Sequence, residues 1–205
     1  MGKTANENLA AFFPVNAVET VKQLLQNNQI ELRIRRGRLS RLGDFRPSVN
    51  NRPARISINS NLNIYEFLLV FLHELAHFFV YLDHGRRARP HGREWRECFG
   101  RLIREFSKKG YFHPYISGML IDYSFRVKAT GLAGIELMKA LRVFDKKAVE
   151  DDWIFLEEIR ENGNFSLRNG RVFQKKDKLR TRFRCLCHDN RRQYLIHHAA
   201  RVKAV

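Results

Sequence analysis

The sequence predicts an α+β protein: a small N-terminal sheet packed on one apolar helix, then more helices, then a C-terminal antiparallel β-meander. Three observations predict this order. Residues 30–59 contain runs in which apolar and polar side chains alternate, as in half-buried strands. Residues 64–83 are apolar on most helical faces, as in a buried central helix. Within residues 164–203, short apolar runs are separated by basic, turn-rich segments. We therefore expect a core in residues 1–145 and a basic, β-rich appendage in residues 146–205.

The elements before the apolar helix are predicted to be one helix and two or three strands. Pro14 suits the first turn of a helix that ends near Gln26 and has four aliphatic side chains on one face. Residues 30–35 and 54–59 each alternate with a period of two, which predicts two strands. These elements would bring a small sheet onto the helix that follows.

The chain has to turn between these two strands. The pairs Arg36-Gly37 and Leu42-Gly43 each supply a glycine for such a turn. A further short strand is expected within residues 38–45. A sheet of this kind has a free edge, where unpaired N–H and C=O groups can bind an extended peptide. We expect a substrate to bind there by strand addition.

The apolar helix has clear signals at both ends. Asn63 is a good N-cap, and Glu66 stands three residues later, as in a capping box. Gly85 follows the last apolar turn as a stop signal. The predicted helix therefore covers residues 64–83.

This helix contains the pattern H-E-x-x-H, formed by His73, Glu74 and His77. Histidines four residues apart lie on one helical face, so both imidazoles can bind a single Zn²⁺. Glu74 is then beside the metal, where it can accept a proton from the attacking water and pass it to a leaving amine. Burying two imidazoles and a carboxylate without such a partner is costly. The alternative is a pair of hydrogen-bonded core histidines with a glutamate between them by chance.

A catalytic zinc site needs a third protein ligand and leaves one position open. His91, in the turn Pro90-His91-Gly92, and Glu97 are the two candidates further along the chain. His84 is nearer, but it falls past the helix end, where it suits the helix dipole better than a metal. The turn favours His91 over Glu97.

The residues around the motif resemble the SprT-like metalloprotease family. The resemblance rests on Phe71-Leu72-His73-Glu74-Leu75-Ala76-His77 followed by His91-Gly92-x-x-Trp95, which opens a helix in that family. It covers about residues 15–110. It implies a zincin-like core, one Zn²⁺ held by His73, His77 and His91, and Glu74 as the general base of a zinc endopeptidase. With Glu97 as third ligand the site would instead be of the thermolysin-like gluzincin type.

The rest of the chain is predicted to be helical and then extended. We expect helices at residues 92–107, 119–127 and 134–144, a strand beginning near residue 153, and strands at residues 171–174, 180–185 and 193–197. Many relatives of the family end in a zinc ribbon, but here the second cysteine pair is missing. A metal-free hairpin is therefore favoured over an irregular metal site, for which the candidate ligands are Cys185, Cys187, His188, His197 and His198.

The net charge of +17 is spread unevenly along the chain. Basic residues dominate residues 31–55 and the C-terminal strands, where they are interleaved with Phe173, Phe183 and Tyr194. Such a pattern suits phosphate contacts combined with base stacking, so we expect a nucleic-acid partner, and the family resemblance implies that it is DNA. The alternative is a solvated basic face. Eukaryotic relatives of the family act on DNA–protein crosslinks, so the resemblance implies an endopeptidase acting on DNA-associated proteins. The second hypothesis is a nucleic-acid-binding protein with a structural or weakly active zinc site.

A membrane-embedded metalloprotease is a third hypothesis, because residues 64–82 are nearly long enough to span a bilayer. The ionisable residues within that run and the lack of a second apolar span argue against it. We see no secretory signal after Met1, and Asn6 breaks the myristoylation pattern. Three cysteines give no disulfide framework. We expect a cytoplasmic protein.

Overall fold

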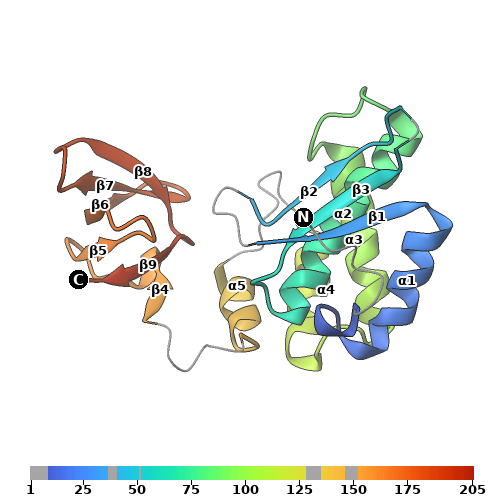
Figure 1. Cartoon of the computed structure of the whole chain (residues 1–205). Helices are drawn as coiled ribbons and strands as arrows, with labels where there is room; N and C mark the ends of the chain where they lie inside the picture. Colours follow the sequence, from blue (N-terminus) through green and yellow to red (C-terminus); the bar gives the residue numbers. More distant parts are fainter. Residues whose placement is uncertain (1–8, 37–40, 51, 128–134, 146–151) are drawn as a thin grey trace. The chain divides into compact units, whose positions relative to one another are not determined.

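The computed structural model describes residues 9–36, 41–50, 52–127, 135–145 and 152–205, and divides the chain into two compact units, residues 1–146 and 147–205 (Figure 1). In the first unit, helices pack with a three-stranded sheet, and the second unit is built on a six-stranded antiparallel sheet. The predicted α+β class is therefore confirmed.

After two short 3-10 helices (Leu9–Ala11 and Val15–Ala17), the first unit contains helix α1 (Val18–Asn27) and a small mixed sheet. Its strands are β1 (Ile30–Arg35), β2 (Gly43–Arg46) and β3 (Ala54–Asn59), in the order β1-β3-β2. The central strand β3 is parallel to β1 and antiparallel to β2. Ile56 and Ile58 of β3 are fully buried on the face that packs against the helices. Strand β2 is thus an edge of the sheet.

The predicted turn at Leu42-Gly43 is wrong. Gly43 begins β2, where it is paired with Ile58. The other predicted turn includes Gly37, which lies outside the described residues. The additional strand expected in residues 38–45 is present as β2, although it begins later than the start of that range.

Helix α2 (Ile64–His84) is the centre of the first unit (Figure 1). The side chain of Asn63 accepts hydrogen bonds from the backbone N–H groups of Tyr65 and Glu66, at 3.1 and 2.9 Å. Gly85 ends the helix with φ +60°, a conformation that favours glycine. Among the described residues α2 is the one helix long and apolar enough to cross a membrane, but half of its most apolar window is buried inside the unit. That burial is typical of a core helix.

Three further helices complete the described part of the first unit: α3 (Arg93–Lys108), α4 (Pro114–Ser124) and α5 (Ile135–Arg142). Helix α4 begins earlier than predicted, because Pro114 starts it and the His113 side chain accepts from the N–H of Tyr115 at 3.2 Å. The large side chains that are fully buried in this unit include Phe13, Phe67, Phe71, Trp95, Phe99 and Phe106. Aromatic packing on α2 and α3 therefore forms the core beneath the candidate site.

The second unit is one antiparallel sheet with strand order β4-β9-β5-β6-β7-β8. Its strands are β4 (Trp153–Phe155), β5 (Asn164–Ser166), β6 (Val172–Lys178), β7 (Arg182–Cys187), β8 (Gln193–His197) and β9 (Arg201–Ala204). Strands β6, β7 and β8 correspond to the three strands predicted within the meander, and β5, at the start of the same region, was not predicted as a strand. The sequence did not predict β9, which returns to pair with both β4 and β5. This strand is short and buries only Val202, so it lacks a clear alternating pattern.

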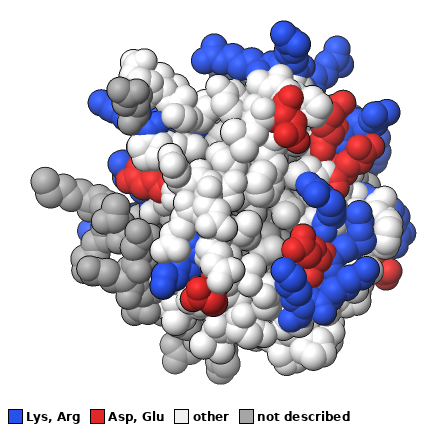
Figure 2. Space-filling view, turned by 90° about the vertical axis from the view of Figure 1, so that its right-hand side faces the viewer, with Lys and Arg blue, Asp and Glu red and all other residues white. Residues whose placement is uncertain are grey.

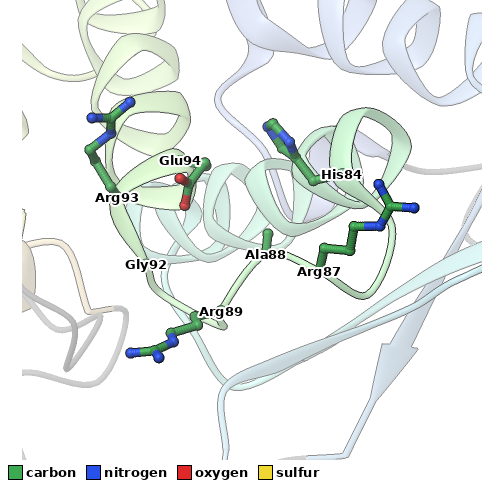
Figure 3. A pocket seen from close by; sticks show the side chains of 7 residues that line it. All are labelled: His84, Arg87, Ala88, Arg89, Gly92, Arg93 and Glu94. Carbon is green, nitrogen blue, oxygen red and sulfur yellow. The ribbon is translucent and has the colours of Figure 1, made fainter.

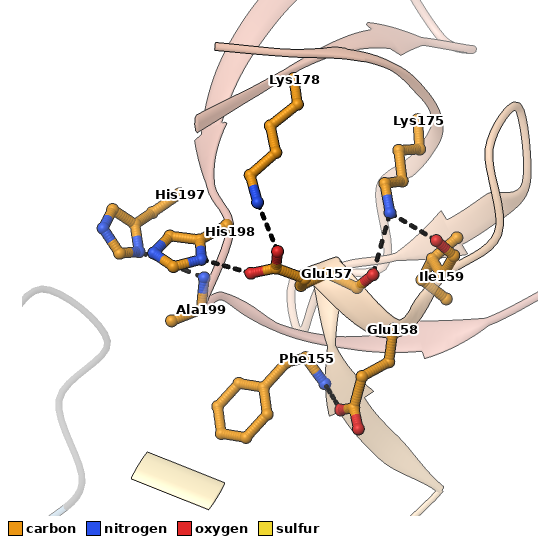
Figure 4. Close-up of polar contacts among 9 residues, drawn as sticks. All are labelled: Phe155, Glu157, Glu158, Ile159, Lys175, Lys178, His197, His198 and Ala199. Atoms are coloured by element: carbon orange, nitrogen blue, oxygen red, sulfur yellow. Dashed lines mark hydrogen bonds and ion pairs between the residues drawn. The ribbon is translucent and has the colours of Figure 1, made fainter. Parts of the chain in front are cut away.

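A polar network holds the turn after β4 against strand β6 (Figure 4). The Lys175 side chain is buried, and its Nζ donates to the carbonyl oxygens of Glu157, at 3.1 Å, and of Ile159. The Glu157 carboxylate accepts from Lys178 and pairs with Nδ1 of His198. These contacts lower the pKa of Glu157 to about 2. The carboxylate is therefore more stable as an anion in the folded unit than in the unfolded chain.

We expect Glu157→Gln to lower the stability of the second unit by about 1–2 kcal/mol at neutral pH, less than the pKa shift alone would give, because 29% of the side chain is exposed. The carboxylate contributes its full stabilisation above its ordinary pKa of 4.5, and loses it as the pH falls toward about 2. The difference in stability between wild type and Glu157→Gln should therefore disappear as the pH falls from 4.5 toward about 2. Hydrogen exchange of β6 amides measures this, and the exposed Glu161→Gln serves as control. A gap independent of pH would contradict the prediction.

Candidate metal centre

Three histidine side chains converge on one point beside α2. His73 and His77 lie one turn apart on α2, and His91 lies in the turn before α3. Nε2 of His91 is 3.0 Å from Nε2 of His77 and 3.1 Å from Nε2 of His73. Within the described ranges, this is the one group of three or more His, Cys, Asp or Glu residues whose ligand atoms all lie within 4.8 Å of one another.

The arrangement fits a shared metal ion better than mutual hydrogen bonds. A nitrogen of a neutral imidazole either carries a hydrogen and donates, or lacks one and accepts. Nε2 of His91 therefore cannot donate to one of its two neighbours and accept from the other. Nitrogens that share a tetrahedral Zn²⁺ at roughly 2.0–2.1 Å lie about 3.3 Å apart, close to the separations observed. Burial lowers the pKa of His73 to about 3 and of His77 to about 4, and it also lowers the pKa of His91. The rings are therefore neutral at pH 7, as metal ligands must be.

The backbone around His91 explains the H-G pair of the motif. His91 has φ +56°, in the left-handed region that few residues other than glycine adopt. Gly92 follows as the N-cap of α3, and its N–H donates to the carbonyl oxygen of Arg89 at 2.9 Å. A Cβ atom at residue 92 would lie 2.9 Å from that same oxygen. His91 therefore faces α2 from a tight turn, and the residue that follows it has no room for a side chain.

Trp95 packs against all three histidines. Its ring centroid lies 4.6 Å from that of His73, 5.2 Å from His77 and 4.5 Å from His91. Its indole Nε1 donates to the backbone oxygen of His73 at 3.3 Å, and only 1% of the residue is exposed. The sequence showed Trp95 as the aromatic residue of the motif and did not reveal this role. One aromatic side chain thus restricts the orientation of all three rings.

Glu74 is buried and lies against the edge strand. It is 6% exposed, and a Cβ atom at Gly43 of β2 would come within 2.8 Å of its Oε1. Phe45, two residues further along β2, packs on α2 through Phe78 and Tyr81, with ring centroids 6.0 Å apart in each case. Strand β2 therefore follows α2 past the candidate site.

Glu97, the alternative third ligand, is not brought to this cluster. Its side chain is 67% exposed and forms an ion pair with Arg93 at 3.4 Å. His84 lies at the exposed end of α2, where it lines an open pocket with Gly92, Glu94 and three arginines (Figure 3). The arginine side chains in Figure 3 point in different directions, so they do not converge on a single anion.

The candidate ligands in the second unit do not assemble into such a cluster among the described residues. Cys185 and Cys187 are buried in the apolar core, and burial raises the pKa of the Cys185 thiol to about 11. His188 is exposed, and His198 pairs with Glu157. In the described part of the chain these side chains therefore do not lie together as the ligands of one ion would.

Comparison with known protein families adds one finding. Residues 15–111 match the family model described as the SprT-like family. This match indicates a metallopeptidase-like function and an association with metal use. No curated protein matches the chain, and no solved structure does.

Proposed function

We propose that this protein is a zinc-dependent endopeptidase. The match of residues 15–111 to the SprT-like family supports the proposal. The observation that carries the proposal is the convergence of three neutral imidazoles, next in sequence to which stands the buried carboxylate of Glu74. The test compares wild type with Glu74→Gln on an unfolded protein substrate. The proposal fails if metal-loaded wild type cuts no substrate, with or without DNA present.

His73, His77 and His91 would hold the ion. Zn²⁺ bound there supplies Lewis-acid activation of water and of the scissile carbonyl. Glu74 follows His73 directly, and its carboxylate oxygen accepts the proton of the attacking water and then delivers it to the nitrogen of the leaving amine. The Trp95 ring packs against all three imidazoles and so restricts the residues that would bind the ion.

The edge strand β2 is the proposed binding site for the substrate backbone. Asn59 N–H donates to the Leu42 oxygen at 2.9 Å, next to the pair formed by Gly43 and Ile58. In an antiparallel ladder, hydrogen-bonded and non-hydrogen-bonded pairs alternate. The N–H and C=O of Gly43 therefore point away from β3, toward the edge that no other described strand occupies. An extended peptide added there would pass directly beside Glu74.

A second candidate function, nucleic-acid binding, is favoured by arginines on the face of the sheet that points away from α2. They are Arg33 and Arg35 of β1, Arg46 of β2 and Arg55 of β3. Arg46 lies directly across from Arg55, and like charges in that position destabilise a sheet. Glu31 and Asp44 form ion pairs with Arg33 and Arg46, at 2.7 and 3.7 Å. Since these acids do not balance the cluster, a phosphate backbone would relieve the repulsion.

The burial of the aromatic residues corrects part of the predicted nucleic-acid surface. Phe173 and Phe183 are 1% and 6% exposed, within the core of the second unit. The predicted base stacking on these two rings is therefore wrong. In the face drawn in Figure 2, acidic groups are mixed with the basic ones and the middle is uncharged, so positive charge does not cover it evenly. The proposed DNA contact thus depends on the arginine cluster of the first unit.

We expect Arg33→Gln and Arg46→Gln each to weaken binding to a DNA oligonucleotide without regard to its sequence. Binding should weaken as salt rises, and the slope of log affinity against log salt should fall by about 1 for each phosphate that the variant no longer neutralises. Lys22→Gln, an exposed substitution on α1, is the matched control. Fluorescence anisotropy in a salt series measures both quantities. Equal slopes in all four proteins would exclude this cluster as the DNA-binding surface.

A further inference from the structure

We propose that Gly43 is a positioning residue for Glu74. Its missing side chain lets the backbone of β2 rest against the Glu74 carboxylate and fix where that carboxylate lies. This inference rests on the proposed peptidase function, since it concerns the residue that would act as general base. It assigns the first residue of the edge strand a role that depends on having no side chain.

The first step is that space, and not backbone conformation, requires glycine at this position. Gly43 is not among the glycines with positive φ in the described chain, which are Gly85, Gly110 and Gly170. It lies in a regular strand, paired with Ile58, where most residues could be accommodated. A Cβ atom there, however, would lie 2.7 Å from Cγ1 of Val70 and 2.8 Å from Oε1 of Glu74. Real Cβ atoms essentially never come so close to another heavy atom.

The second step is that the strand cannot easily move away. Phe45 holds β2 on α2 by packing against Phe78 and Tyr81. The other side of β2 is paired along its whole length with β3. Helix α2 is in turn fixed by a fully buried aromatic core that includes Phe67 and Phe71. The side chains of Val70 and Glu74 therefore take up the strain when atoms are added at residue 43, and the flexible end of Glu74 moves more easily than the short Val70 side chain.

The third step is that a substitution at residue 43 should affect the Glu74 carboxylate and not the three histidines. Among the atoms nearest to a Cβ at residue 43 are Val70 Cγ1, Glu74 Oε1 and Glu74 Cγ, the last at 3.0 Å, and none belongs to a histidine. The three histidines are restrained separately by Trp95. Gly43→Ala should therefore displace the proton acceptor and leave the imidazole cluster intact. Such a variant would bind metal and substrate and still turn over slowly.

The test compares Gly43→Ala with Gly118→Ala, a control in helix α4 where an added Cβ meets nothing within 4 Å. We expect Gly43→Ala to keep its bound zinc and its KM for an unfolded protein substrate, and to lose at least about tenfold in kcat, as misplacement of a catalytic group does. The ¹³C signal of the Glu74 carboxyl, assigned by its absence in Glu74→Gln, should shift in Gly43→Ala and not in Gly118→Ala. This second measurement does not depend on turnover.

The double variant Gly43→Ala/Val70→Ala separates the two crowded contacts. Removing the Val70 branches relieves one of them and leaves the contact with Glu74. Persistent loss of kcat supports the proposal. Full recovery would assign the effect to helix packing and overturn it, as would loss of zinc from Gly43→Ala or an unchanged kcat. If wild type itself is inactive, the proposed function fails, and the carboxyl signal still decides whether Gly43 positions Glu74.

Discussion

Glu74→Gln is expected to abolish measurable proteolysis, with kcat falling by about 10²–10⁴-fold, because the amide keeps the size of the carboxylate and cannot accept a proton. Glu74 is not one of the three converging ligands, so the variant should bind as much zinc as wild type. It should also keep its fold, since the buried side chain is replaced by one of nearly equal volume. Cleavage of an unfolded protein, measured beside zinc content and thermal unfolding, tests all three statements.

The matched control is Glu105→Gln, which replaces an exposed carboxylate on α3 that pairs with Lys109. It should retain full activity. Removing zinc from wild type with a chelator should cause the same loss of activity as Glu74→Gln. Adding zinc back should restore the activity of wild type and should not restore that of Glu74→Gln. Cleavage by Glu74→Gln at the wild-type rate would mean that another group takes the proton or that a contaminant cuts the substrate.

His91→Ala is expected to weaken zinc binding by more than about 100-fold, because loss of a direct ligand costs more than the 10–100-fold of an outer partner. Glu97→Ala should leave zinc affinity unchanged, since Glu97 lies in solvent beside Arg93. Competition with a chromophoric chelator measures both affinities. Retention of zinc by His91→Ala together with its loss from Glu97→Ala would reverse the proposed ligand assignment.

The sequence predicted those elements whose signals are local. The caps Asn63 and Gly85 and the alternation in β1 act within a few residues, and the observed elements begin and end close to the predicted positions. The turn at Pro90-His91-Gly92 favoured His91 as the third ligand, and the structure brings this residue, and not Glu97, to α2. The i, i+4 spacing predicted the pair on α2, and the turn together with the family resemblance predicted the third member.

Features that depend on distant parts of the chain could not be predicted. Strand β9 is defined by its partners β4 and β5 and not by its own pattern. Gly43 was interpreted as a turn glycine, because its reason for being glycine is the approach of Glu74 from another element. The burial of Phe173 and Phe183 follows from strand register, which interleaved basic and aromatic residues do not reveal.

The three converging imidazoles belong to two segments, since His73 and His77 lie on α2 and His91 lies in the turn that leads into α3. An ion shared by them would therefore act as a crosslink that closes the loop between the two helices. Occupancy and folding of the first unit would then be thermodynamically linked, so that zinc raises its melting temperature in proportion to the logarithm of free zinc. Part of the metal-binding free energy would hold the backbone of His91 in its strained conformation. Without the metal, this backbone could relax.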